Sequence, residues 1–279
     1  MPHLATFRKG WENERLAEYL LSRFSFVAQP TSSADDLGSD FFCTIFEIRE
    51  VSGQDALMPR ISFAIQVKSS VDDVPANNKI DYLMGLELPF FIGVVGQSPP
   101  EMNIYSAELL PLLFSELGRP EKLSLVPVDA FDPDKYLDGS GIADARMRCH
   151  LVATLSVKDD RSTLAPKVEE LIRICVRARN NIATRVNEEH IYDLDGKGLH
   201  KIVAGSGSAL HFRANFVKRL GEVFYNLYYI VGQAPPDEFL IAEFSAFETL
   251  YHQLEASQGP MPPFVRIPYN ACKEKMLLL

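Results

Sequence analysis

The chain of 279 residues is 47% hydrophobic and 23% charged, which excludes a disordered or fibrous protein and allows one large or two modest hydrophobic cores. Its formal net charge of -9 disfavours a protein that coats nucleic acid nonspecifically, because such binding depends on many Lys and Arg contacts to phosphate. Four widely separated cysteines without a CxxC pair argue against a cysteine zinc site and a disulfide framework.

Membrane and export signals are missing from the amino-acid pattern. No apolar run reaches the roughly 20 residues that span a bilayer, and the first residues lack the apolar stretch of a secretory signal. The sequence therefore predicts a cytoplasmic protein that does not use a membrane as a partner.

The first elements predicted along the chain are a helix and two strands. Apolar residues recur with helical spacing from about residue 8 to residue 24, and the aromatic and β-branched run 41–48 favours a strand. Turn residues fill 51–60, and a second strand follows over 60–70. Together the two strands predict a hairpin with a long connection.

Further helices and strands alternate after this hairpin. Residues 75–86 fit a short helix, the apolar run 88–96 fits a buried central strand, and residues 104–105 indicate a brief strand before a leucine-rich helix. This alternation predicts an α/β fold, with a mixed β-sheet flanked by helices, over residues 1–120.

The pattern of apolar and turn residues in the sequence changes near Pro120. Residues 121–160 are predicted to form a connecting segment with one strand, because turn residues precede a single alternating apolar stretch. Residues 161–279 are predicted to be a mainly α-helical accessory or partner-binding region, with helices from Pro166, over 209–231 and over 237–256. A protein partner would bind this region, and a homo-oligomer is also compatible with it.

The residues with the clearest chemical meaning lie on the first two predicted strands. Asp40 stands at the entry of one strand, and Gln66 and Lys68 stand at the end of the next. Because strand side chains alternate, Gln66 and Lys68 emerge on one face while Val67 points to the other. Adjacent strands can bring these groups into a shared site.

This arrangement resembles the PD-(D/E)XK nuclease superfamily, whose motif is an Asp at a strand start and a (D/E/Q)-x-Lys on the neighbouring strand. Asp40, the run Gln66-Val67-Lys68 and a Glu on the first helix, Glu14, occupy these places in order. The resemblance covers roughly residues 8–115. It extends to a bacterial domain-of-unknown-function branch found near defence genes, through WENERLAEYL, DDLGSD, FAIQVKSS and KIDYLMGLELPFFIGVV.

The resemblance implies a catalytic site made of Glu14, Asp40, Gln66 and Lys68, with Mg²⁺ or Mn²⁺ as cofactor. It implies that Asp40 is the principal metal ligand, that Glu14 supports the cation or its water, and that the Gln66 side chain and the Val67 backbone carbonyl complete the protein contacts. Mg²⁺ prefers such oxygen ligands, and it activates water for phosphodiester hydrolysis. Lys68 would orient that water or stabilise the charged phosphorane.

The Gln66 position departs from the carboxylate that many superfamily members carry. The neutral amide removes one negative charge, so metal affinity should fall unless Glu14 or Glu47 compensates. Asp36 is an alternative acid to Asp40, ranked lower because Asp40 directly precedes the strand.

Three further side chains are candidates for nucleic-acid contact. Ser69 follows Lys68 directly, although strand-end serines usually bond neighbouring backbone groups. Arg173 and Arg177 stand in a basic stretch of a predicted helix, although Glu169 four residues before Arg173 is typical of an ordinary charged helix surface.

The resemblance thus implies a metal-dependent nuclease that cleaves phosphodiester bonds, with DNA favoured over RNA as the bound nucleic acid, and with a role as effector of an antiphage system. Two alternatives stay open: a catalytically inactive interaction subunit that keeps the nuclease scaffold, and a nuclease that acts on RNA.

Overall fold

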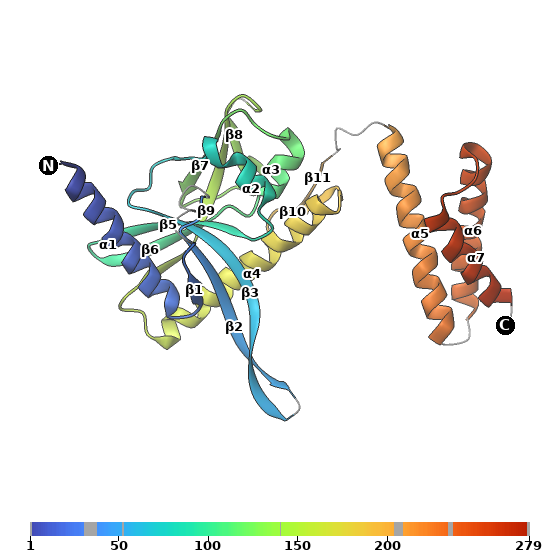
Figure 1. Cartoon of the computed structure of the whole chain (residues 1–279), viewed down its shortest axis with the longest axis horizontal. Coiled ribbons are helices and arrows are strands. Elements are labelled where there is room, and N and C mark those ends of the chain that lie inside the picture. The colour runs from blue at the N-terminus through green and yellow to red at the C-terminus, as the bar shows by residue number, and fades with distance from the viewer. Residues whose placement is uncertain are drawn as a thin grey trace. The chain divides into compact units, whose positions relative to one another are not determined.

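The structure, a computed structural model, divides into two compact units, Met1–Gly205 and Ser206–Leu279 (Figure 1). Its described residues are 2–30, 38–51, 53–139, 141–203, 209–233 and 237–277.

The first unit is built on a mixed sheet of nine strands. Eight of them follow the order β1-β2-β3-β5-β6-β9-β7-β4, and β8 pairs with β9. The pairs β3–β5 and β7–β9 are parallel, and the other pairs are antiparallel. The strands are β1 (Phe26–Ala28), β2 (Phe41–Val51), β3 (Gln54–Lys68), β4 (Val74–Pro75), β5 (Phe90–Gln97), β6 (Pro100–Ser106), β7 (Leu123–Val128), β8 (Leu137–Gly139) and β9 (Ala145–Ser156).

Helices cover both faces of this sheet, which confirms the predicted mixed sheet flanked by helices. One apolar core lies between the sheet and the long helices α1 and α4, and the other lies under η2, α2 and α3. The helical elements of the unit are α1 (Pro2–Ser22), η2 (Asn77–Lys79), α2 (Ile80–Gly85), α3 (Leu110–Leu117), η3 (Pro133–Lys135) and α4 (Arg161–Val186).

Strand β3 contributes side chains to both cores because its residues alternate between the two faces. Phe63 and Ile65 are buried in the core shared with α1 and α4, whereas Ala64 is buried in the core on the opposite face. Gln66, two residues after Ala64, therefore projects toward the layer of η2, α2 and α3.

Strands β2 and β3 continue beyond the sheet as a long two-stranded ribbon (Figure 1). The predicted long connection between them is wrong, because β2 runs to Val51 and β3 already begins at Gln54. Cross-strand pairs such as Ile48 with Leu57 carry the ladder through the segment that looked like a loop. Both of these side chains are about two-thirds exposed or more, at 71% and 67%.

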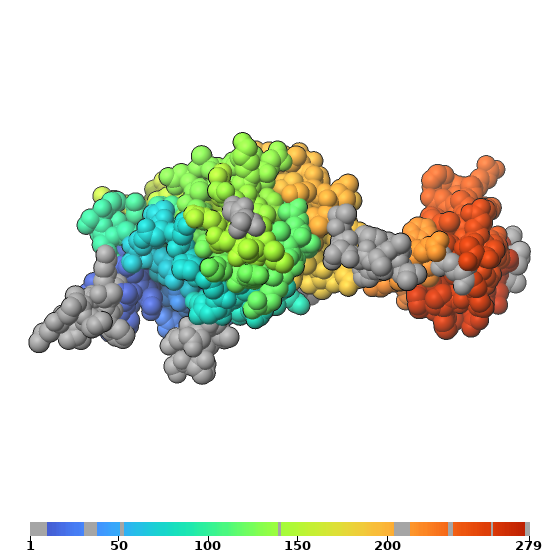
Figure 2. Space-filling model, turned by 90° about the horizontal axis from the view of Figure 1, so that it is seen from above, coloured from blue at the N-terminus to red at the C-terminus, as the bar shows by residue number. Residues whose placement is uncertain are grey.

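The predicted boundary near residue 120 is also wrong. Strands β7 and β9 are part of the main sheet, and β9 lies between β6 and β7 in its interior. Figure 2 shows residues 121–139 and 141–156, coloured green to yellow-green, packed into the body of the first unit. The segment 121–160 is therefore not a connection, and α4, expected in the accessory region, covers the sheet instead.

Helix α4 begins at Arg161, five residues before the predicted start at Pro166. The Asp160 side chain caps the helix by accepting a hydrogen bond from the Thr163 N–H at 2.8 Å, which satisfies one of the free donors of the first turn. After α4, strands β10 (Ile191–Asp193) and β11 (His200–Ile202) form a small two-stranded sheet.

The described residues of the second unit form three helices, as the periodicity of residues 209–231 and 237–256 predicts in part. Its core surrounds the fully buried Phe224, whose ring contacts Phe244, Tyr251 and Tyr269 edge to face. The helices are α5 (Ala209–Gln233), α6 (Glu238–Gln258) and α7 (Pro263–Leu277).

None of the helices in the described part of the chain combines enough residues with enough hydropathy to cross a membrane.

Candidate active site

The ladder between β2 and β3 ends where the predicted site begins. Phe41 and Ile65 are the last paired residues, and the Asp40 N–H still donates to the Ile65 carbonyl oxygen at 2.9 Å. The Asp40 carboxylate then accepts the Val67 N–H at 2.5 Å. The Asp40 side chain thus takes the place of a backbone acceptor for the Val67 N–H beyond the end of the ladder. This hydrogen bond holds Asp40 beside the end of β3.

The Val67 carbonyl oxygen lies on the same side of β3 as Asp40. In a strand, the N–H and C=O of one residue point to the same edge, and the Val67 N–H points to Asp40. The ladder to β2 has already ended at Ile65, so this carbonyl stands beyond its last pair. A carboxylate and a carbonyl oxygen are consequently neighbours at the end of the strand.

Gln66 and Lys68 project from the opposite side of the β3 pleat to Val67. Their parallel neighbours on β5 are Ile92 and Val94, both buried in the core under η2, α2 and α3. Gln66 is only 6% exposed, so its amide must find polar partners inside the protein.

Two lysines supply those partners. With its amide oxygen turned toward them, Gln66 accepts a hydrogen bond from Lys79 Nζ at 2.7 Å and is 3.3 Å from Lys68 Nζ. Lys79 is the last residue of η2, and the crossover from β3 to β5 carries it back over the sheet. The sequence did not single out Lys79, because no strand or helix period relates residue 79 to residue 66.

Lys68 is chemically altered by these surroundings. Burial lowers the pKa of its ammonium group, the positive charge of Lys79 lowers it further, and the Asp40 carboxylate opposes both effects. The group therefore loses its proton more easily than a solvated lysine does.

The segment that leads into β2 packs directly on the segment that carries Lys79. Gly38 has a φ of +99°, and a Cβ there would lie 2.9 Å from Lys79 Cδ and 3.2 Å from a ring carbon of Tyr82. The neighbouring Ser39 Oγ is 2.7 Å from the Tyr82 hydroxyl. Asp40 and Lys79 are held near each other by this contact.

We expect Gly38→Ala to reduce the free energy of unfolding of the first unit by about 1–2 kcal/mol, since alanine meets both an unfavourable φ and the Lys79 side chain. Gly85→Ala is the matched control, because a Cβ at Gly85 meets nothing within 4 Å. Urea denaturation of both variants checks the prediction, and equal stabilities would contradict it.

Glu14 lies in the other helical layer. It shares a face of α1 with Ala17 and Leu21, which are fully buried against the sheet. Asn13 accepts a hydrogen bond from the side chain of Gln97 at the end of β5, so this part of α1 stands at the same end of the sheet as Lys68. The part of α1 that carries Glu14 thus lies at the same end of the sheet as Lys68, but in the helical layer on the face opposite to Gln66.

The oxygen atoms around Asp40 fit a hard cation with few protein ligands. Mg²⁺ binds to one or two carboxylates and keeps several waters, and the Asp40 carboxylate and the Val67 carbonyl are donors of this type. Within the described residues, no group of three or more His, Cys, Asp or Glu side chains could hold a metal ion. The fit therefore depends on one carboxylate assisted by neutral oxygens and water.

The three predicted nucleic-acid contacts differ in their exposure. Ser69 is exposed just past β3, and Arg173 is exposed but paired with Glu170. The prediction for Arg177 is wrong: its side chain is 7% exposed and donates two hydrogen bonds of 2.5 Å to the buried Glu108. Arg177 therefore forms a buried ion pair with Glu108 and does not face solvent as part of a basic helix surface.

Glu47, the acid that could compensate for the neutral Gln66, is engaged elsewhere. Glu47 lies on the β2–β3 ribbon, where it forms ion pairs with Arg49 and Arg60. Asp36 lies outside the described residues.

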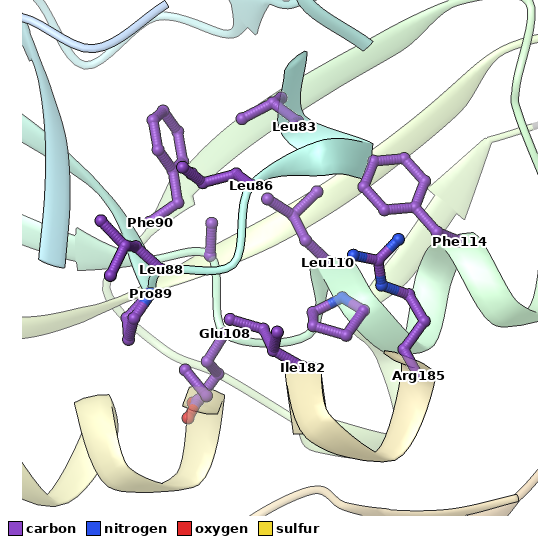
Figure 3. A pocket seen from close by; sticks show the side chains of 13 residues that line it. Leu83, Leu86, Leu88, Pro89, Phe90, Glu108, Leu110, Phe114, Ile182 and Arg185 are labelled. Atoms are coloured by element: carbon purple, nitrogen blue, oxygen red, sulfur yellow. The ribbon is translucent and has the colours of Figure 1, made fainter. Parts of the chain in front are cut away.

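A small pocket on the first unit is separate from these residues (Figure 3). Its walls are mostly apolar, and Figure 3 shows the Arg185 guanidinium between Leu110 and Phe114. Among the described residues, Arg185 Nε has no hydrogen-bond partner. None of Asp40, Gln66 and Lys68 lines this pocket, so it is not an extension of the candidate site.

Comparison of the chain with protein-family models, with curated proteins and with solved structures found no match.

Proposed function

We propose that the chain is a metal-dependent nuclease that hydrolyses phosphodiester bonds, most readily in DNA, and that its first unit is a PD-(D/E)XK domain. The observation that carries the proposal is the meeting of Asp40, the Val67 carbonyl and Lys68 at the end of β3. An antiparallel pair β2–β3 followed by a parallel β5 provides the frame for this meeting.

The residues divide the chemistry between them. A bound Mg²⁺ or Mn²⁺ would neutralise charge on the phosphate and lower the pKa of a water molecule. Asp40 would hold this cation, with the Val67 carbonyl beside it and Glu14 assisting from α1. Lys68 would donate to the phosphate oxygens as negative charge develops on them, which is where a fixed cation accelerates the reaction most.

The acidic net charge of -9 bears on how substrate is acquired. A protein of negative net charge attracts duplex DNA only weakly as a whole, so a protein partner bound to the second unit would deliver the substrate in a cytoplasmic setting. Tight binding of DNA by the chain alone would make the partner unnecessary. The proposed role in antiphage defence rests on the resemblance in sequence.

The experiment is cleavage of supercoiled plasmid, linear duplex DNA, single-stranded DNA and RNA with Mg²⁺, Mn²⁺ or EDTA. We expect wild-type protein to cut DNA with metal only, and Lys68→Ala to be slower by about a hundredfold because one transition-state cation is lost. Lys122→Ala, at an exposed lysine of the same unit, is the control. Preferential cutting of RNA would change the substrate, and metal-independent cutting would refute the mechanism.

A second candidate function is a nuclease scaffold that binds phosphate without cutting. It is favoured by the orientation of Gln66, whose amide oxygen faces two lysines and leaves Asp40 as the main charged ligand. Such a protein would show no cleavage on any substrate, and Lys68→Ala would weaken its binding of nucleic acid without any turnover to lose.

A further inference from the structure

Two positively charged groups converge on one neutral atom at the end of β3. Lys79 Nζ and Lys68 Nζ are 2.7 Å and 3.3 Å from the Gln66 amide oxygen. Like charges at such short range repel each other, and a shared neutral acceptor relieves only part of that repulsion. The pair is therefore arranged for an additional anionic partner.

Each ammonium group keeps donors for that partner. A lysine ammonium has three N–H donors, and the contact to Gln66 uses one of them in each case. Asp40 opposes the charge of Lys68, but its carboxylate also accepts the Val67 N–H. Lys79 and Asp40 both lie close enough to Lys68 to act on its charge, so two cations and one carboxylate meet at the end of β3, while Glu14 lies in the layer on the other face of the sheet.

Lys79 is positioned and not a freely moving surface lysine. Its aliphatic chain lies against Gly38, and the Ser39–Tyr82 hydrogen bond ties the same two segments together. Gln66 itself is buried, and its place on β3 is fixed by pairing with Ile92 of β5. A held pair of cations loses little conformational freedom when it binds an anion.

We propose that Lys68 and Lys79, held by Gln66, form a clamp for a backbone phosphate of the nucleic acid, in which both ammonium groups bind non-bridging phosphate oxygens. This inference rests on the proposed function for the identity of the ligand. It assigns Lys79 to substrate binding, and it makes Gln66 the holder of the two lysines and not a metal ligand, because its amide oxygen already accepts both N–H donors.

The test measures binding without turnover. A labelled duplex oligonucleotide is titrated with wild-type protein and with Lys79→Met in EDTA and in Ca²⁺, at several salt concentrations. We expect Lys79→Met to weaken binding about tenfold, since a charge-assisted hydrogen bond is lost. The slope of log K against log[salt] should fall by about 0.9, which corresponds to one phosphate contact.

Two variants serve as matched controls. Lys122→Met makes the same change at an exposed lysine of the same unit and should bind as wild type does. Lys79→Arg keeps the positive charge and should recover most of the affinity. Methionine keeps an aliphatic chain of similar length, so a merely structural role of that chain would leave Lys79→Met binding as the wild type does.

Gln66→Glu separates the two roles of residue 66. A carboxylate there would offset one of the two positive charges and compete with phosphate for both lysines, so the clamp predicts about tenfold weaker oligonucleotide binding in EDTA. If Gln66 were a metal ligand instead, the same change would strengthen the binding of Mn²⁺ measured by calorimetry, whereas a carboxylate engaged by the two lysines would leave Mn²⁺ binding no stronger than in the wild type.

The outcomes distinguish the clamp from the nuclease. Wild type that binds but does not cut, with weaker binding by Lys79→Met, supports the clamp and refutes the nuclease. Wild type that cuts, with unchanged binding and salt slope in Lys79→Met, refutes the clamp alone. Wild type with no affinity for duplex DNA, single-stranded DNA or RNA overturns the clamp as well.

Discussion

Asp40→Asn is expected to reduce metal-dependent cleavage by about a thousandfold, the largest effect of any single change at the site. The Val67 N–H needs an acceptor, and the asparagine can supply only its one amide oxygen for it. The NH₂ group then faces the position of the cation, where it cannot act as a ligand. The fold should persist because the hydrogen bond to Val67 is kept.

Binding of Mn²⁺, followed by isothermal titration calorimetry, gives a readout that does not depend on turnover. We expect Asp40→Asn to weaken it strongly, and Asp72→Asn, the same change at an exposed residue shortly after β3, to leave it unchanged. If Asp40→Asn binds Mn²⁺ as the wild type does, the metal lies elsewhere and the proposed function loses its main support.

Arg177→Met is expected to destabilise the first unit by about 3–5 kcal/mol, because it leaves a buried carboxylate without its partner. The Glu108 side chain is 1% exposed and receives both hydrogen bonds from Arg177. Gly196, in the turn between β10 and β11, covers the guanidinium so closely that a Cβ would lie 2.9 Å from it. Water therefore has little access to replace the arginine.

The same helix supplies the control for this change. Arg173 is paired with Glu170 at the surface, and Arg173→Met should alter stability by no more than about 0.5 kcal/mol. Hydrogen exchange of peptides from β9 and α4 reports the stability of the first unit by itself. The double change Arg177→Met with Glu108→Leu should recover most of the loss, since it removes both charges together. Equal effects of Arg173→Met and Arg177→Met would show that burial of the pair is unimportant.

The local part of the candidate site could be predicted from the sequence. A strand has a period of two residues, so Gln66 and Lys68 had to share a face wherever β3 lay in the sheet. The position of Asp40 directly before an apolar run placed it at a strand entry, and the structure brings it to the Val67 N–H. Gln66 and Lys68 were thus related by local backbone geometry alone, whereas the pairing of β2 with β3 brings Asp40 to Val67.

The long-range part could not be predicted in this way. Lys79 meets Gln66 only because the crossover returns from β3 before β5 begins, and no local pattern records how a loop folds back. Arg177 carries the same charge as Arg173 one turn earlier, yet one is buried on Glu108 and the other faces solvent. Whether an arginine of α4 is buried on a carboxylate depends on which segments of the chain pack against that face of the helix.

The extent of the first unit was decided by strand pairing. The apolar alternation of residues 145–156 predicted a strand, but a strand by itself does not specify its partners, and β9 pairs with both β6 and β7. The sequence by itself determined the helix and strand periods, the mixed α/β character and the Asp40, Gln66 and Lys68 set. Only the tertiary structure decided the continuation of the sheet to β9, the burial of Arg177 and the approach of Lys79, because each depends on contacts between residues far apart along the chain.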